Sequence, residues 1–220
     1  ASGGLARLDT PDPRFPADAA GVSLERRRFA SRGGLKLDGA LAAHGPSVEG
    51  LCLLDAGCST GGFTDCLLER GASRVIAVDV GYGQLAEKLR RDGRVVSMER
   101  VNARTLAPGS LAEPADIVVI DVAFISLALI LGPARSVLRD GLGPIVALVK
   151  PQFEVGKGQV GRGGIVRDET QRQAVLQRIV RHADELGLRV LKTLDCPVKG
   201  KKGNHEMLAI FELAAQFHGM

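Results

Sequence analysis

Short apolar runs separated by helical patterns organise the chain from Leu51 onward. The runs predict seven strands, at 51–55, 75–79, 94–98, 117–121, 144–150, 189–194 and 206–213. Helical spacing of apolar side chains predicts the intervening helices, at 62–70, 84–91, 127–139 and 168–186. Asp168 and Glu169 suit the start of the last helix, because carboxylates are stabilised at a helix N-terminus.

This alternation predicts an α/β fold. We expect a doubly wound, mostly parallel, seven-stranded sheet with helices on both faces. Most of the runs are continuously apolar, as in strands that are buried on both faces. Ligands of such sheets bind outside the carboxyl ends of the strands. Asp55, Asp79, Asp121 and Lys150 fall at these ends, so we expect them to share one crevice.

The first 30 residues differ from the rest in composition. They are rich in Pro, Gly, Asp and Arg and show little periodicity, which predicts a linker or loosely attached arm over 1–30. The remaining residues, 31–220, are expected to form one domain, since 220 residues suit a single α/β core. The basic run 26–28 has two open interpretations, a solvated tether or a phosphate contact.

A glycine-rich turn follows the first predicted strand and opens a helix. Glycines let backbone N–H groups approach a ligand closely, yet the spacing is neither that of a dinucleotide fingerprint nor that of a P-loop. A turn without a phosphate-binding lysine, followed by an acid suited to a ribose diol, fits S-adenosylmethionine, which has no phosphate. The predicted cofactor-binding residues are Gly57, Ser59, Thr60, Gly61, Gly62, Asp79, Asn102 and Asp121.

Two lysines and two carboxylates stand out in four short motifs. These residues are Lys36, Asp121, Lys150 and Glu206, in the motifs at 31–37, 121–127, 150–154 and 203–206. Such a set around a nucleotide-binding turn predicts a reaction at a hydroxyl group, whose proton must leave as a new bond forms. Each residue alone is more often a surface charge or an ion-pair partner, so the prediction depends on all four together.

The motifs closely resemble those of a known family. SRGGLKL at 31–37, DAGCSTGGFT at 55–64, DVGYGQL at 79–85 and KPQFE at 150–154 are similar to the TlyA family of ribosomal RNA 2′-O-methyltransferases, historically labelled hemolysins. The resemblance runs from about Ser31 to the last strand. It implies a Rossmann-like methyltransferase fold, S-adenosyl-L-methionine as methyl donor, and cytidine ribose in ribosomal RNA as acceptor. Ribosomal RNA or ribosomal subunits are the implied partners.

The catalytic domain of this family is similar to the FtsJ-type methyltransferases, which use a Lys-Asp-Lys-Glu tetrad. The resemblance places the tetrad on Lys36, Asp121, Lys150 and Glu206. Two departures are visible. Ala123 stands where members usually have Ser, a change expected to affect packing. Members also carry a small N-terminal RNA-binding domain, and we expect that domain to be absent upstream of Ser31.

Lys150 is expected to activate the ribose hydroxyl by withdrawing its proton. Lys36 would lie nearby, and Asp121 and Glu206 would orient the two lysines. A second possibility stays open, in which Lys150 keeps its charge and only positions the oxygen.

RNA contacts are expected from basic and aromatic side chains around the crevice. The predicted RNA-binding residues are Arg32, Phe153, Lys157, Arg162, Lys201 and Lys202. The segment 154–167 contains five glycines together with basic residues, so it suits a mobile basic lid or a plain loop equally well.

Composition narrows the alternatives. The net charge of +4 is compatible with a polyanionic partner but on its own is weak support for one. The four cysteines form no C-x-x-C pair, so we expect no metal site, and reduced thiols in a cytoplasmic protein. No apolar run approaches the roughly 20 residues that span a bilayer, which argues against a hemolysin-like membrane-active protein. A non-catalytic cofactor- or RNA-binding module is the other alternative, and the complete tetrad argues against it.

Overall fold

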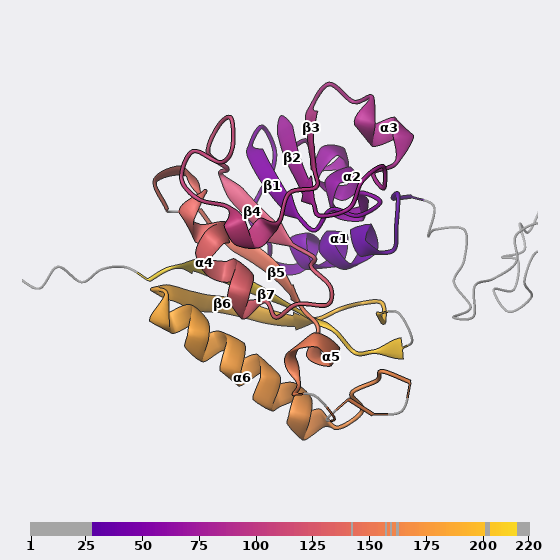
Figure 1. The fold of residues 1–220 in the computed structure, drawn as a ribbon, viewed down its shortest axis with the longest axis vertical. Coiled ribbons are helices and arrows are strands. Elements are labelled where there is room, and N and C mark those ends of the chain that lie inside the picture. The colour runs from indigo at the N-terminus through magenta and orange to yellow at the C-terminus, as the bar shows by residue number, and fades with distance from the viewer. Residues whose placement is uncertain are drawn as a thin grey trace, which may run out of the picture.

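The computed structural model describes residues 28–141, 143–156, 158, 160–161, 163–200 and 203–214. Its centre is a seven-stranded sheet in the order β3-β2-β1-β4-β5-β7-β6 (Figure 1). The strands are β1 (Cys52–Ala56), β2 (Arg74–Asp79), β3 (Val95–Glu99), β4 (Ile117–Ile120), β5 (Ile145–Val149), β6 (Leu188–Asp195) and β7 (Met207–Leu213). The helices are α1 (Gly33–His44), α2 (Gly62–Glu69), α3 (Glu87–Arg90), α4 (Ala128–Ser136), α5 (Pro151–Glu154) and α6 (Glu169–Glu185).

The sheet is parallel except at one strand. β1 to β5 run parallel to one another, whereas β7 pairs antiparallel with both β5 and β6. The strand order reverses between β1 and β4, and ligands of doubly wound sheets bind at such a switch point. The predicted fold class is confirmed.

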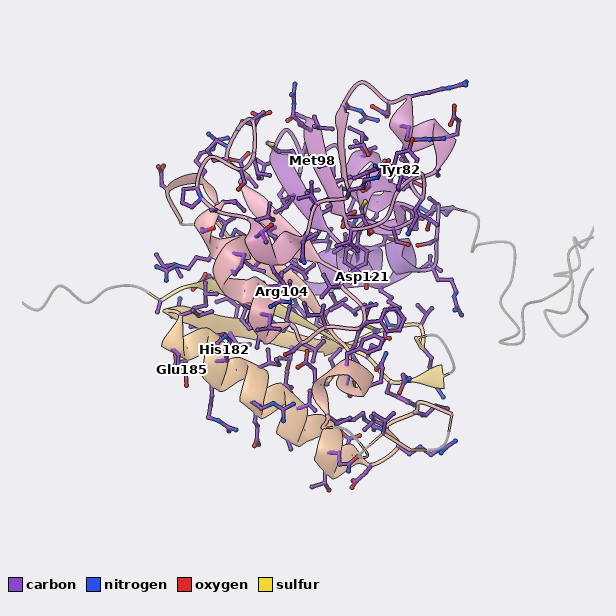
Figure 2. The ribbon with its side chains drawn as sticks, viewed as in Figure 1. Tyr82, Met98, Arg104, Asp121, His182 and Glu185 are labelled. Atoms are coloured by element: carbon purple, nitrogen blue, oxygen red, sulfur yellow. The ribbon has the colours of Figure 1, made fainter. Side chains whose placement is uncertain are left out.

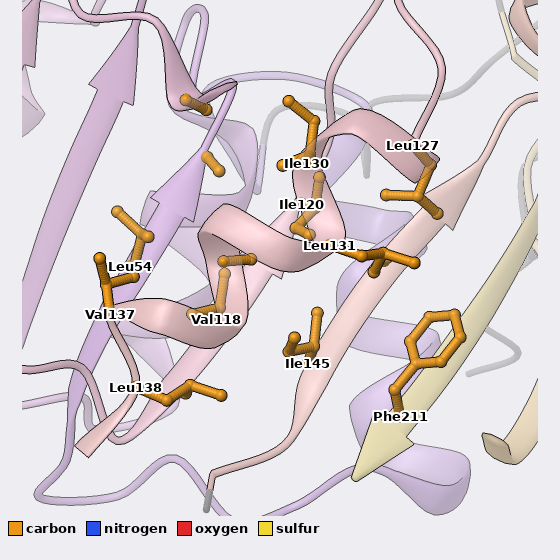
Figure 3. Close-up of a cluster of buried hydrophobic side chains, with 14 of the residues drawn as sticks. Leu54, Val118, Ile120, Leu127, Ile130, Leu131, Val137, Leu138, Ile145 and Phe211 are labelled. Atoms are coloured by element: carbon orange, nitrogen blue, oxygen red, sulfur yellow. The ribbon is translucent and has the colours of Figure 1, made fainter. Parts of the chain in front are cut away.

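Successive strand residues belong to opposite faces of the sheet, and each face has its own apolar core. Leu54, Val118 and Ile145 pack with α4 and α6 in one core, which Figure 3 shows in part. Leu53 and Ile117, one position earlier on their strands, pack in the other core with α1, α2 and α3. Because β1, β4 and β5 are buried on both faces, their sequences are continuously apolar.

Several predicted elements differ from the observed ones. Helix α1 was not predicted, although it carries Lys36. It begins with two glycines, and Arg32 before it makes no capping hydrogen bond, although the hydroxyl of Ser31 accepts from the N–H of Gly33 (3.2 Å). The helix predicted over 84–91 is shorter, at Glu87–Arg90, and the one predicted over 127–139 ends at Ser136. The short helix α5 after Lys150 was also not predicted.

The end of the predicted N-terminal arm packs against the domain. Phe29 is buried, and the backbone N–H of Ala30 donates a hydrogen bond to Asp65 (2.6 Å). Arg28 forms ion pairs with Asp38 of α1 and Glu69 of α2. Residues 1–27 of the predicted arm lie outside the described residues.

Candidate active site

A cleft of about 330 Å³ lies at the carboxyl ends of the central strands. Its walls come from α1, from the glycine-rich turn after β1, from the ends of β4 and β5, and from the segment before β7. Asp121, labelled in Figure 2, follows the last residue of β4. All four residues of the predicted tetrad line this cleft, although they are spread over 170 positions of the chain.

The tetrad forms two ion pairs, and the first of them is buried. Lys36 Nζ donates a hydrogen bond to Glu206 Oε2, and the side chains are 9% and 3% exposed. Gln152 Nε2 donates to the other oxygen of Glu206, at 2.9 Å. A Cβ atom at Gly200 would overlap this carboxylate, so the backbone before β7 lies directly against it. Glu206 is therefore held from three sides.

The second ion pair is more open to solvent. Lys150 Nζ lies 2.5 Å from Asp121 Oδ1, and the two side chains are 13% and 23% exposed. Among the described residues, Asp121 Oδ1 has no hydrogen-bond partner besides this ammonium group. Lys150 follows β5 directly and Asp121 follows β4, so the parallel pairing of these strands brings the two together.

The glycine-rich turn is built for close packing. Gly57 has φ +87°, and a Cβ there would lie 2.8 Å from the carbonyl oxygen of Asp121. A Cβ at Gly62 would overlap the hydroxyl of Ser31. The backbone N–H of Ser59 donates to Asp79 Oδ2 (2.8 Å), and that of Gly81 donates to Oδ1 (2.7 Å). Asp79 thus fixes the turn to the end of β2.

Asp55 is fully buried beneath the turn. Its Oδ2 accepts hydrogen bonds from the backbone N–H (2.9 Å) and the hydroxyl (2.6 Å) of Thr64 in α2. Burial raises the pKa of Asp55 to about 7, against the opposing effect of the Thr64 hydrogen bonds, and the nearby charge of Asp121 adds to the rise. Asp55 links β1 to α2 and does not line the cleft.

The structure brings together most of the predicted cofactor residues. Gly57, Ser59, Thr60, Gly62 and Asp121 line the cleft, whereas Gly61, Asp79 and Asn102 do not.

The three residues outside the cleft have other partners. A Cβ at Gly61 would overlap side chains of Leu85 and Leu89, so this glycine serves packing against α3. Asn102 Oδ1 accepts from the backbone N–H of Arg104, which caps a 3₁₀ turn. The assignment of these three to the cofactor stays a prediction.

The predicted RNA-binding residues are only partly described. Arg32 and Phe153 line the cleft, whereas Lys157, Arg162, Lys201 and Lys202 lie outside the described residues. The basic side chain of Lys199 also lines the cleft.

Phe124 and Gln152 were not among the predicted site residues. Phe124 is 90% exposed, and its ring centroid lies 5.0 Å from that of Phe153. Gln152 holds Glu206 in place. Both lie within three residues of a predicted catalytic residue, and this proximity in sequence was the available signal.

The cysteines carry no catalytic function in this arrangement. All four are free thiols, and Cys58, which lines the cleft, has its pKa raised by burial. A protonated thiol is a poor nucleophile at neutral pH. Within the described part of the chain, no three His, Cys, Asp or Glu side chains are grouped as metal ligands.

Comparison with known proteins agrees with this geometry. The family described as FtsJ-like methyltransferase matches residues 29–213. The chain belongs to the FtsJ-like methyltransferase family. It is 51% identical over 185 residues to the 16S/23S rRNA (cytidine-2'-O)-methyltransferase TlyA of Mycobacterium tuberculosis, covering 84% of this chain and 69% of that protein. The predicted resemblance to TlyA is therefore confirmed.

Two further matches show how proteins of this kind are named. Hemolysin A of Brachyspira hyodysenteriae is 43% identical, covering 84% of this chain and 77% of that protein. A solved structure from Streptococcus thermophilus, described as a hemolysin candidate, has a TM-score of 0.82 and 46% identity, covering 86% of this chain and 68% of that one. Relatives of this chain thus carry both the methyltransferase and the hemolysin name.

Proposed function

We propose that this protein transfers a methyl group from S-adenosylmethionine to the 2′-hydroxyl of a cytidine in ribosomal RNA. The observation that carries the proposal is the pair of lysine–carboxylate contacts beside the glycine-rich turn. The substrate class is supported by the 51% identical relative, named as a 16S/23S rRNA (cytidine-2'-O)-methyltransferase. Ribosomes are in the cytoplasm, so a cytoplasmic location is part of the proposal.

The residues of the cleft fit the cofactor. Gly57 and Gly62 leave no room for a side chain, so the backbone forms that wall of the cleft. The same wall carries the hydroxyl-bearing residues Ser59 and Thr60 and no lysine, as suits a ligand without phosphate. When bound, the cofactor supplies a methyl group on a sulfonium, which leaves as a neutral thioether.

Lys150 is the proposed proton acceptor. A ribose hydroxyl is a poor nucleophile until its proton is withdrawn. In its ion pair with Asp121 (2.5 Å) Lys150 is an ammonium group, so it would first release a proton to solvent. Its neutral amine would then accept the proton of the hydroxyl, and Asp121 would stabilise the ammonium that forms again. Lys150 is also the lysine of the more open pair, which suits a group that must reach the substrate.

Lys36 and Glu206 have a different proposed role. Their pair is buried and Glu206 is fully occupied by Lys36 and Gln152. We assign this pair to shaping the cleft around the acceptor ribose, which increases the rate by orienting the hydroxyl.

The RNA side of the cleft is aromatic and basic. Phe124 and Phe153 form its exposed wall, and Arg32 and Lys199 border the same cleft. In the proposal these residues bind the acceptor nucleotide and its phosphates, together with Lys157, Arg162, Lys201 and Lys202.

The hemolysin name of some relatives suggests a membrane-active protein as a second candidate. None of the helices in the described ranges has both the length and the apolar character needed to cross a bilayer. A vesicle-leakage assay distinguishes the candidates, because the methyltransferase is expected to leave vesicles intact.

The proposed activity is tested by incubating the purified chain with tritiated S-adenosylmethionine and unmodified ribosomal subunits. Digestion of the RNA to nucleosides should then show the label in 2′-O-methylcytidine. Label in a methylated base would contradict the assignment of the 2′-hydroxyl, and binding of the cofactor without any transfer would contradict the activity.

A further inference from the structure

Two of the motifs at the cleft extend well beyond their catalytic residues. The segment 121–127 begins with Asp121 and the segment 150–154 begins with Lys150, yet each keeps a distinctive sequence for several more residues. Their far ends meet at Glu154. Its Oε2 accepts a hydrogen bond from the hydroxyl of Ser126 (2.7 Å), and its Oε1 accepts one from the backbone N–H of Leu127 (2.7 Å).

Glu154 also caps helix α4 from outside that helix. The residue before α4 is Leu127, which has no side-chain acceptor for the free N–H groups of the first turn. The hydroxyl of Ser126 accepts from the N–H of Ala128 (3.3 Å), and the carboxylate of Glu154 accepts from the N–H of Leu127 just before the helix. A negative charge is stabilised at a helix N-terminus. The contact is local in space but joins residues 27 positions apart.

The loop that Glu154 holds contains a strained residue. Phe124 has φ +65°, an unfavourable backbone conformation for a bulky side chain, which persists only when neighbouring contacts fix it. On one side of Phe124 the backbone N–H of Asp121 donates to Ala56 (3.0 Å). On the other side the contacts to Glu154 hold Ser126 and Leu127.

We propose that Glu154 is a positioning residue for the acceptor side of the cleft, and this inference rests on the proposed function. Its carboxylate fixes the loop 121–127 against α5. It thereby sets the distance between Phe124 and Phe153 and the placement of Asp121 beside Lys150. Glu154 acts through these residues, and it does not line the cleft itself.

The side chain of Glu154 can be removed without detaching α5. Arg178 of α6 donates a hydrogen bond to the backbone carbonyl of Glu154, and this contact does not involve the carboxylate. The backbone N–H of Val155 also donates to Pro151 (3.0 Å). Glu154→Ala should therefore loosen the loop 121–127 and leave α5 in place.

Three variants test the proposal in the methyl-transfer assay. Glu154→Ala should raise KM for ribosomal subunits and lower kcat, together costing about tenfold or more in kcat/KM, with unchanged affinity for S-adenosylmethionine. Glu154→Gln should restore most of the activity, because its amide can accept from Leu127 and donate to the Ser126 hydroxyl. Glu113→Ala is the matched control, since that exposed carboxylate pairs with Arg74 at the amino end of β2 and does not line the cleft.

A double variant separates positioning from general stability. If Glu154 acts through Phe124, then Glu154→Ala should cost much less in a Phe124→Ala background than in the natural sequence. Equal cost in both backgrounds would overturn the proposal, as would kinetics of Glu154→Ala equal to those of the unsubstituted protein.

Hydrogen exchange tests the same contact without any activity. The amide of Leu127 should exchange faster in Glu154→Ala, by about tenfold, and recover in Glu154→Gln. Unchanged exchange would overturn the proposal. An unsubstituted protein that transfers no methyl group would contradict the proposed function, and the exchange experiment would still decide whether Glu154 holds the loop.

Discussion

The two lysine–carboxylate pairs of the cleft have the same chemistry but different surroundings. Lys36 and Glu206 are both buried, and Glu206 has a second donor in Gln152. Lys150 and Asp121 are more exposed, and Lys150 is the sole partner of Asp121 Oδ1 among the residues that the structure describes. A buried pair is expensive to break because the remaining charge stays desolvated, whereas an open pair can change its protonation and partner. We therefore propose a structural role for the first pair and proton transfer for the second.

Removal of Lys150 should have the largest effect on activity. Lys150→Ala is expected to reduce methyl transfer by about 10³-fold or more, since general-base catalysis contributes factors of that order. The affinity for S-adenosylmethionine should change little, as measured by calorimetry. Lys192→Ala is a matched control, because Lys192 is an exposed lysine on β6. A parallel loss of cofactor binding would show that Lys150 is structural.

Removal of Lys36 should have the largest effect on stability. Lys36→Ala leaves Glu206 buried and without its ammonium partner, which is expected to cost about 3–5 kcal/mol. The free energy of unfolding from urea titration measures the loss. Lys36→Met combined with Glu206→Gln removes both charges and should recover part of that loss. A double variant that is less stable than Lys36→Ala would contradict the idea that the unpaired, buried charge of Glu206 causes the loss.

A methyl group at Gly200 should disturb only the buried pair. The Cβ of Gly200→Ala would overlap the carboxylate of Glu206, and we expect a loss of about 1–3 kcal/mol from overpacking. Gly203→Ala is not suitable as its control because Gly203 has φ +87°, but Gly93→Ala is, since Gly93 has open space around it. Equal stability of Gly200→Ala and Gly93→Ala would contradict the close approach at Glu206.

The last prediction concerns the pH dependence of stability. The pKa of Asp55 is about 7 in the folded protein, above the ordinary value for an unfolded chain. Between about pH 4 and 7 the folded state therefore binds more protons than the unfolded state, so this residue makes stability fall as pH rises through that range. Asp55→Asn keeps an acceptor for Thr64 and cannot ionise. The Tm of Asp55→Asn relative to the natural sequence should rise from pH 5 to pH 8, and a constant difference would contradict the assignment.

The strands, and the functional residues at their ends, could be predicted because strands buried on both faces have continuously apolar sequences. Strands β1, β4 and β5 are apolar at every position, and the strand-end residues Asp121 and Lys150 follow from sheet geometry alone. Helix α1 was not predicted from periodicity, since it begins with Gly33-Gly34, two residues of low helix propensity. The family resemblance, rather than any local pattern, pointed to Lys36.

The arrangement of the site was less predictable than its members. Which lysine pairs with which carboxylate depends on contacts such as that of Lys36 with Glu206, which are 170 positions apart. The different burial of the two pairs follows from the backbone at Gly200 and from Gln152, neither of which has a sequence signal for this role. The contacts of Glu154 likewise require the placement of α5 beside α4.

The most direct test compares Lys150→Ala with Lys36→Ala in single-turnover methyl transfer, with Tm measured on the same samples. Both enzymes are saturated with S-adenosylmethionine and ribosomal subunits, so that binding does not limit the rate. The account predicts that Lys150→Ala transfers the methyl group much more slowly while its Tm stays close to that of the unsubstituted protein. For Lys36→Ala it predicts a large decrease in Tm. Two results would contradict it: methyl transfer by Lys150→Ala at the rate of the unsubstituted protein, or an equal decrease in Tm in the two variants.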